Sequence, residues 1–192
     1  MREIAVLSFV SLDGVMQGPV QPDEDTSGGF TQSGWSAPYL EEVMTLVNRE
    51  LMEEPVAFLF GRKTYEMFAR HWPNVTGSEH GDLLNRSKKY AVTSTLETAA
   101  WQNSELITGD CVEALRHLKA QDGPRLQVHG SAGLIQTLTA HDLVDEFRLF
   151  TFPVVLGAGK RLFEGDTAPA RLSLSRSQTT KNGVVMSIYR RS

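Results

Sequence analysis

Two glycine-led turns constrain this chain more than any other sequence feature, because each stands where a buried strand would lead into a helix. One is Gly61-Arg62-Lys63-Thr64 after the apolar residues 56–60, and the other is Gly130-Ser131-Ala132-Gly133 after residues 126–129. A strand that ends in glycine at a helix N-terminus presents backbone N–H groups and the positive end of the helix dipole to an anion. Two such turns in one small chain predict a ligand with more than one phosphate group.

The first turn also carries side chains that suit a nucleotide phosphate. Gly61 lets the backbone approach closely, Thr64 has a hydroxyl to donate, and Arg62 and Lys63 supply positive charge. We therefore predict a pyridine-nucleotide site and favour NADPH as the cofactor. The competing interpretation, a plain helix start with two solvated basic residues, has comparable weight on these four residues alone.

Length, charge and cysteine content narrow the class of protein. The 192 residues fit a single domain, residues 1–192, that can bury a hydrophobic core. A formal net charge of −4 without a basic stripe argues against nucleic-acid binding. The lone Cys111 rules out an intrachain disulfide, and the first residues enter a strand pattern without a signal-peptide pattern, so we expect a cytoplasmic protein. No apolar run is long enough for a membrane span, and the five histidines lack metal-ligand spacing.

Strand and helix patterns alternate along the first two thirds of the chain. Apolar runs predict strands at residues 4–10, 56–60, 89–93, 106–107, 126–129, 146–152 and 184–189. Helices are expected around residues 40–51 with Ser36 as N-cap, at 64–70, after the cap Asp110, and around 134–138. Residues 71–86 look irregular. The pattern predicts an α/β fold with a mostly parallel sheet covered on both faces and antiparallel strands at its C-terminal edge.

Two further motifs have alternative interpretations. Ser131 between glycines suggests a nucleophile elbow, but His129 stands where the first glycine belongs and no histidine follows His141 to complete a triad. Gly157-Ala158-Gly159 begins like a dinucleotide fingerprint, but Leu162 occupies the third glycine position. We interpret Gly157 and Gly159 as points where the backbone passes close to a ligand.

Asp13 and Trp35 are the candidate substrate residues. Asp13 follows the first strand, at the edge where open α/β sheets bind ligands, so its carboxylate would orient a substrate or relay a proton. An ordinary turn aspartate is an equally good interpretation. Trp35 ends a long polar loop, residues 17–34, and would stack on a flat substrate or belong to the core. The loop itself is a candidate lid.

Several of these segments resemble a known superfamily. Gly61-Arg62-Lys63-Thr64-Tyr65-Glu66 followed by Tyr90-Ala91-Val92-Thr93-Ser94 resembles the cofactor-binding part of dihydrofolate reductase. The stretches from Gly130 to Leu134 and from Pro153 to Phe163 resemble the reductase domain of the bifunctional riboflavin-biosynthesis deaminase–reductase, the RibD C-terminal domain. Ser11-Leu12-Asp13-Gly14 fits this domain and its stand-alone bacterial relatives.

The resemblance implies a dihydrofolate reductase-like fold, NADPH as hydride donor, and a homodimer. It places the cofactor against these residues: Gly61, Arg62, Lys63, Thr64, Thr93, Ser94, Thr95, Gly130, Ser131, Ala132, Gly133 and Leu134. It places the substrate against Asp13, Gly14, Trp35, Tyr65, Gly157, Gly159 and Phe163.

We therefore expect an NADPH-dependent reductase that transfers a hydride to a heterocyclic or ribosylamino-pyrimidine substrate. The alternatives are dihydrofolate reductase-like activity on a pterin and a non-catalytic NADP(H)-binding module. The helix before Gly61 has Val43 and Met44 where dihydrofolate reductases carry a pterin-binding acid, with Glu41 and Glu42 nearby.

Overall fold

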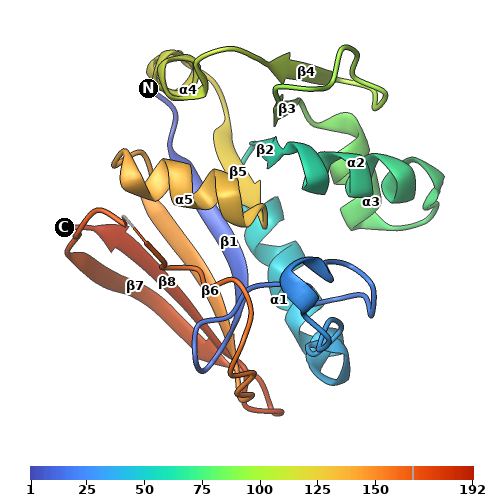
Figure 1. Ribbon diagram of the computed structural model, residues 1–192, viewed down its shortest axis with the longest axis vertical. Coiled ribbons are helices and arrows are strands. Elements are labelled where there is room, and N and C mark those ends of the chain that lie inside the picture. The colour runs from blue at the N-terminus through green and yellow to red at the C-terminus, as the bar shows by residue number, and fades with distance from the viewer. Residues whose placement is uncertain (166) are drawn as a thin grey trace.

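The computed structural model describes residues 1–165 and 167–192, which form one eight-stranded sheet with helices packed on it (Figure 1). The strands are β1 (Ile4–Ser11), β2 (Val56–Gly61), β3 (Lys89–Val92), β4 (Ser104–Ile107), β5 (Arg125–His129), β6 (Glu146–Phe152), β7 (Leu172–Thr179) and β8 (Val185–Arg191). The helices are α1 (Leu40–Met52), α2 (Arg62–His71), α3 (Glu79–Arg86), α4 (Cys111–Ala120) and α5 (Ala132–Ala140).

The strand order is β4-β3-β2-β5-β1-β6-β8-β7. The pairs from β4 through to β6 are parallel, whereas β8 pairs antiparallel with β6 and β7 antiparallel with β8. Parallel neighbours require crossover connections, and helices supply them except between β3 and β4, where residues 93–103 form a loop without a helix. The prediction of a mostly parallel sheet with antiparallel C-terminal strands is confirmed.

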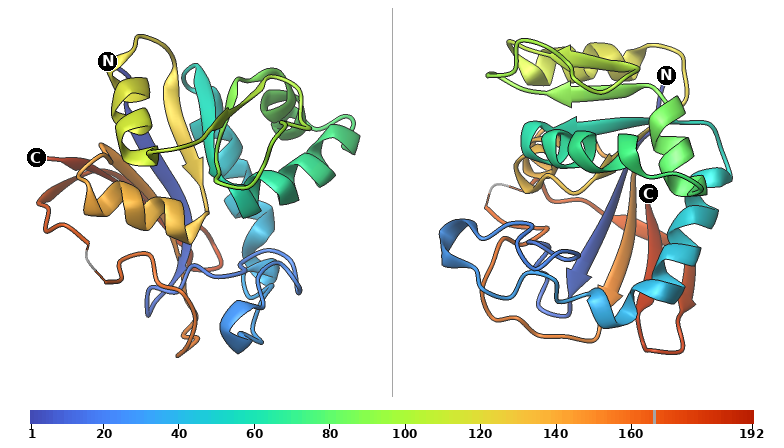
Figure 2. Two further views of the ribbon diagram at one scale, coloured as in Figure 1. Left: turned by 45° about the horizontal axis from the view of Figure 1, so that its top comes forward. Right: turned by 90° about the vertical axis from the view of Figure 1, so that its right-hand side faces the viewer.

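Helices cover both faces of the sheet, and each face has its own hydrophobic core (Figure 2). On one face, Val43 and Leu51 of α1 belong to the same buried cluster as Phe58 and Phe150 of the sheet. On the other face, helices α4 and α5 bury Leu115, Leu118, Leu134, Ile135 and Leu138. Coverage from both sides explains why β1 and β2 are nearly continuous apolar runs.

Two local predictions were wrong. Residues 71–86 are not irregular throughout, because α3 forms within them, with the Ser78 hydroxyl accepting the Gly81 N–H at 3.2 Å. Ser36 does not cap α1, because its hydroxyl donates instead to the Pro19 carbonyl at 2.7 Å, and α1 begins after a 3₁₀ turn, Ala37–Tyr39. The predicted cap Asp110 is confirmed by its bonds from the Val112 and Glu113 amides at 3.0 and 3.1 Å.

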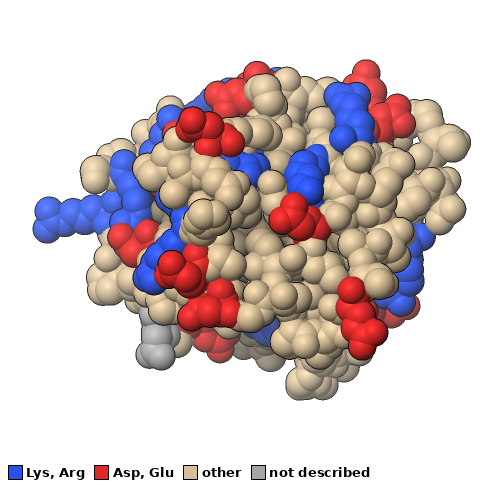
Figure 3. Space-filling model, turned by 90° about the horizontal axis from the view of Figure 1, so that it is seen from above, with Lys and Arg blue, Asp and Glu red and all other residues tan. Residues whose placement is uncertain are grey.

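The surface carries both signs of charge. Figure 3 shows lysine and arginine side chains interspersed with aspartate and glutamate on the face viewed from above. Several of these charges pair, as Lys88 does with Glu105 at 2.8 Å. Within residues 1–165 and 167–192, no helix has the length and apolar character that crossing a bilayer demands.

Candidate active site

The two glycine-led turns meet in space. The Gly61 backbone N–H donates to the Ser131 Oγ at 2.9 Å, and that hydroxyl in turn donates to Thr64 Oγ1 at 2.6 Å. A Cβ on Gly61 would lie 3.0 Å from both Cβ and Oγ of Ser131, tighter than most Cβ contacts, so Ser131 would have to shift to admit a larger residue. The N-termini of α2 and α5 thus share one closely packed, hydrogen-bonded junction.

Both helices at this junction begin without a side-chain cap. Gly61 has no side chain to cap α2, and the Ser131 hydroxyl is turned away from α5 toward Thr64 and Gly61. By contrast, Ser78 and Asp110 cap α3 and α4 with their own side chains. Uncapped first-turn N–H groups at a helix start are what an anion binds.

The backbone shape of the second turn leaves room above α5. Gly130 and Ser131 have φ of 57° and 65°, a left-handed conformation that is uncommon for serine. A Cβ at Gly130 would meet only Thr64 Oγ1, at 4.0 Å, and one at Gly133 would meet nothing within 4 Å. Side-chain-free positions with open space beside them suit the close approach of a phosphate to the backbone.

Polar side chains border the junction on the α2 and β3 sides. Arg62 pairs with Glu66 one turn on, at 2.8 Å, and its side chain is 39% exposed. Lys63 is exposed. At the end of β3, the Thr93 hydroxyl is buried and accepts the N–H groups of Thr95 and Leu96, whereas Ser94 and Thr95 are exposed.

Strand β1 has an open side next to the second turn. Its pairing with β5 ends at Leu7 opposite His129, but its pairing with β6 continues to Ser11 opposite Phe152. There β5 leaves the sheet through Gly130 and enters α5. The crevice outside the carboxyl ends of the strands at such a point is where open α/β sheets bind ligands.

Asp13 stands beyond the end of β1 and holds the loop that follows β6. Its carboxylate accepts the Ser11 hydroxyl at 2.6 Å and the Leu156 and Gly157 amides at 3.1 and 2.8 Å. The Ser11 hydroxyl, followed by the Leu156 amide, lowers the pKa of Asp13 to about 2. At neutral pH Asp13 is an ionised group that fixes the backbone of residues 156–157.

The long loop of residues 17–34 is tied to the same region. Lys160 Nζ contacts Asp25 Oδ2 at 2.5 Å and Ser27 Oγ at 2.7 Å, and the Lys160 amide donates to Gln17 Oε1 at 3.0 Å. Burial alone would raise the pKa of Asp25, but hydrogen bonds from Lys160 and Ser27 lower it to about 2. The sequence reading missed this set of contacts, because Lys160 and Gln17 carry no motif.

Gly159 fits tightly beneath the same loop. Its φ is 118°, and a Cβ there would lie 2.7 Å from Val15 Cγ1 and 2.9 Å from Phe30 Cε2. Gln32 adds a further bond, from its side-chain amide to the Leu156 carbonyl at 2.8 Å. In this structure the loop is clamped onto residues 156–160.

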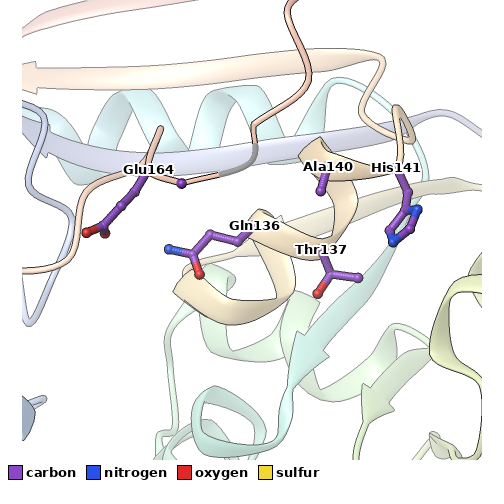
Figure 4. Close-up of a pocket in the computed structure, with 6 residues that line it drawn as sticks. Gln136, Thr137, Ala140, His141 and Glu164 are labelled. Carbon is purple, nitrogen blue, oxygen red and sulfur yellow. The ribbon is translucent and has the colours of Figure 1, made fainter.

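Three predicted substrate residues, Asp13, Gly14 and Phe163, line a pocket of about 280 Å³ at the ends of β1 and β6. The rest of its wall consists of Val10, Ser11, Leu12, Leu149, Thr151, Arg161 and Leu162. Arg161 Nε donates to the Asp13 carbonyl at 3.0 Å. A larger open hollow of about 530 Å³ lies along α5; Figure 4 shows Gln136 and Thr137 on the helix and Glu164 on the facing loop.

Trp35 and Tyr65 lie outside this pocket. The Trp35 indole N–H donates to the Gln17 carbonyl at 2.8 Å, and its ring packs edge-on against Phe152 at 5.2 Å. Tyr65 is only 1% exposed, and its hydroxyl accepts the Trp101 amide at 3.0 Å. Tyr65 is thus part of the core on the α1 face, and we do not carry it into the proposed site.

The strand order, the paired glycine turns and the antiparallel C-terminal strands define a dihydrofolate reductase-like domain. Residues 2–186 match the RibD C-terminal domain, and the chain belongs to that family. It is 29% identical to the uncharacterized protein YyaP of Bacillus subtilis (strain 168), over 98% of this chain and 94% of that protein.

Solved structures share the fold. A pyrimidine reductase-like protein from Corynebacterium diphtheriae superposes with a TM-score of 0.64 at 13% identity, over 100% of this chain and 92% of that one. Dihydrofolate reductase from Enterococcus faecalis, complexed with NADP(H) and RAB-propyl, gives a TM-score of 0.64 at 11% identity, over 99% and 96% of the two chains. Membership of this family supports a reductase-type oxidoreductase in general.

Proposed function

We propose that this protein is an NADPH-dependent reductase that delivers a hydride to a C=N or C=O bond of a heterocyclic or ribosylamino-pyrimidine substrate. The observation that carries the proposal is the junction of α2 and α5, where two uncapped helix N-termini meet beside the open side of β1. A dinucleotide has two phosphates to place against such a pair of anion sites.

The residues present fit the cofactor. Gly130 to Gly133 would hold the pyrophosphate, since added Cβ atoms at the two glycines would point into open space. Gly61 and Thr64 would fix the junction, and Arg62 with the exposed Ser94 and Thr95 would bind the ribose 2′-phosphate. When bound, the nicotinamide supplies the hydride.

The protein's own part in the reaction is to bind and orient. Asp13 is ionised and already accepts three donors, so we assign it a positioning role: it holds the residue 156–157 backbone at the crevice. Gly14, Gly157, Gly159 and Phe163 would shape the substrate side, and the clamped loop of residues 17–34 would exclude water.

Reduction of a pterin is the weaker candidate, because the acids of α1 are engaged elsewhere or exposed. Glu42 accepts the Lys181 amide at 2.7 Å, and Glu41 is exposed. Glu50 is fully buried in an ion-pair network with Arg148 and Arg176. Val43, one of the two residues where a pterin-binding acid would stand, is in the hydrophobic core.

The test is a titration of the purified protein with NADPH, NADH and FMN, followed by intrinsic fluorescence. We expect micromolar NADPH binding and much weaker NADH binding, then NADPH oxidation at 340 nm with ribosylamino-pyrimidine or related heterocyclic acceptors. Binding without oxidation by any acceptor would favour the non-catalytic module, and no nicotinamide binding would overturn the cofactor assignment. The homodimer expectation is tested separately by light scattering.

A further inference from the structure

The antiparallel strands at the C-terminal edge of the sheet are covered by a helix on one face only. On that face, Met186 and Ile188 of β8 are buried in the same cluster as Val43 and Leu51 of α1. On the opposite face α5 lies over β1, and among the described residues no helix lies over β8 and β7 (Figure 1). The second face of β8 and β7 is therefore a sheet surface without a covering layer.

The side chains of this uncovered face carry no charge. Cross-strand pairing aligns Val185, Ser187 and Tyr189 of β8 with Thr179, Ser177 and Leu174 of β7. Directly paired residues share a face, and these six point away from α1 because they alternate with the buried Met186 and Ile188 along β8. We call the six residues the open sheet face.

Exposure of the open sheet face is unusual for residues of its kind. Its three β7 residues are exposed, Leu174 by 55%, and Val185 and Tyr189 are half-buried. An antiparallel sheet that leaves one face in water normally carries polar residues on that face. A surface without charge that exposes aliphatic and aromatic side chains is instead typical of the core of a protein–protein interface.

The open sheet face adjoins the pocket at the ends of β1 and β6. Leu149 of β6 pairs with Ser187 and also lines that pocket of about 280 Å³. Leu12 and Phe163, in the same pocket wall, are 64% and 48% exposed. Exposed apolar side chains thus continue from the open sheet face to the rim of the pocket, and contiguous apolar patches mark interaction sites.

The lack of charge on the open sheet face indicates which partner fits it. A nucleic acid, an anionic lipid surface or a charged peptide would find no counter-charge there. A two-fold interface brings a patch against a copy of itself, so a charge near the axis would meet its own sign, and an uncharged patch avoids that repulsion. Two sheets also pack face to face about 10 Å apart, and a second copy of this chain supplies the second sheet.

We propose that a second copy of this chain packs on the open sheet face with two-fold symmetry, sheet against sheet, and that it forms a wall of the adjoining pocket. The pairing of the two copies is independent of any activity. The wall's contribution to substrate binding rests on the proposed function, which places the substrate side at Gly14 and Phe163 of that pocket.

Sedimentation equilibrium tests the pairing, and the parent protein should be a dimer at micromolar concentration. Leu174→Lys and Thr179→Lys should each raise the dimer Kd by about a hundredfold or more, because each buries an unpaired charge in both copies. Met52→Lys is the matched control, since Met52 is an apolar side chain at the end of α1 that is 42% exposed. Urea unfolding verifies that all three variants fold.

Three outcomes would overturn the pairing. The first is a parent protein that stays monomeric at these concentrations. The second is a dimer that Met52→Lys weakens as much as Leu174→Lys does, because the open sheet face would then have no special role. The third is a series of assemblies that grow with concentration, because head-to-tail packing extends without limit whereas two-fold packing closes at two copies.

Iodination of tyrosine locates the interface by a second route. Tyr189 should be protected in the parent dimer and react in Thr179→Lys, with the half-buried Tyr90 of β3 as internal reference. Thr179 and Tyr189 stand in pairs at opposite ends of the open sheet face, so the substitution does not itself uncover Tyr189. Equal reactivity of Tyr189 in dimer and monomer would overturn the assignment of this face.

Steady-state NADPH oxidation tests the wall of the pocket. Monomeric Leu174→Lys should show a substrate KM raised by about fivefold or more and an NADPH Kd within about twofold of the parent value, because it loses substrate contacts only. A parent KM in this monomer would overturn the wall. A protein that dimerises but oxidises NADPH with no acceptor would locate the failure in the proposed function, which removes the role of the wall and leaves the pairing in place.

Discussion

Gly61 and Ser131, which lie 70 residues apart, are joined by a hydrogen bond of 2.9 Å from the Gly61 N–H to the Ser131 Oγ. Because that hydroxyl also reaches Thr64, it cannot cap its own helix, and the first-turn amides of α5 are left for a ligand. One side chain therefore both ties two helices together and keeps their anion site open.

Ser131→Ala should destabilise the fold and weaken cofactor binding together. It leaves the Gly61 N–H without its acceptor, and because this donor is only partly buried, the cost should lie toward the lower end of the range of about 1–3 kcal/mol for buried donors. Gly61→Ala should be at least as damaging, since its Cβ would meet Ser131 at 3.0 Å. Urea unfolding measures the loss of stability in the two variants. Gly133→Ala, whose Cβ meets nothing within 4 Å, is the control for stability alone, and an equal loss of stability there would show that the junction has no special role.

Arg62→Ala should reduce NADPH affinity by about tenfold or more while changing NADH affinity little, because a guanidinium binds phosphate through charge-assisted hydrogen bonds. Arg62 pairs with the partly exposed Glu66, and exposed ion pairs add little stability, so the variant should keep its stability. Lys63→Ala is the neighbouring control and should have the smaller effect. Equal losses for NADPH and NADH, measured by fluorescence titration, would remove the case for phosphate selectivity at Arg62.

Gly159→Ala should release the clamp on the long loop. The new Cβ would collide with Val15 and Phe30 in a left-handed backbone position, so we expect a clear drop in Tm and faster proteolysis within residues 17–34. Lys160→Met, which removes the contacts to Asp25 and Ser27, should also speed proteolysis with a smaller change in Tm. A loop as protease-resistant in both variants as in the parent protein would show that other contacts hold it.

Deleting residues 17–34 tests the lid role itself. The shortened enzyme should show a raised apparent substrate KM or a lowered kcat, because the loop is placed to exclude water from the crevice. Steady-state NADPH oxidation would measure the effect, and unchanged kinetics would rule the lid out.

Most of the fold could be predicted from the sequence, because the hydrophobic periodicity of a strand or a helix is contained within a few neighbouring residues. The apolar runs of β1, β2, β5 and β6 and the Asp110 cap are legible within a few residues. Helix α3 could not be recognised in the same way, because its residues His80, Gly81 and Asp82 form a polar sequence. The burial of His80 depends on Asn48 of α1 and on Trp72.

The site shows the same division between local and distant information. Each glycine turn is visible in the sequence. The contact between Gly61 and Ser131 is not, because it depends on the pairing of β2 with β5, two strands that lie far apart in the sequence. The Leu156 and Gly157 amides that donate to Asp13 lie more than 140 residues away in the sequence. The burial of Arg125, Gln127 and His129 was also hidden, because their alternation with Leu126 and Val128 looks like an ordinary half-exposed strand.

Acid should destabilise the protein already at pH values above those at which Asp13 and Asp25 take up protons. Burial lowers the pKa of His80 to about 4 and of His129 to about 3, so the folded state keeps both neutral. An unfolded histidine titrates near 6.5, so between pH 6.5 and 4 the unfolded chain binds more protons and stability falls as the pH falls. Each histidine contributes a slope of up to about 1.4 kcal/mol per pH unit.

Urea unfolding at several pH values measures this slope, and His80→Gln should reduce it by about half. Asp13 and Asp25, whose pKa values are both about 2, lose their stabilising interactions only below about pH 4 and so do not overlap this window. A flat stability profile from pH 6.5 to 4 would mean that the two imidazoles accept protons in the folded state.

Glu50→Gln should be among the most destabilising single changes outside the crevice. Glu50 is fully buried, its carboxylate contacts Arg176 and lies 3.6 Å from Arg148, and its carbonyl accepts Arg148 Nη1 at 3.0 Å. Removing the charge leaves the buried Arg148 with less compensation, which costs about 3–5 kcal/mol in comparable pairs. Glu53→Gln is the matched control, because Glu53 also pairs with Arg176 but is 42% exposed and should change stability by less than about 1 kcal/mol. Similar losses in the two variants, measured by urea unfolding at pH 7, would show that burial of Glu50 adds nothing to the pairing.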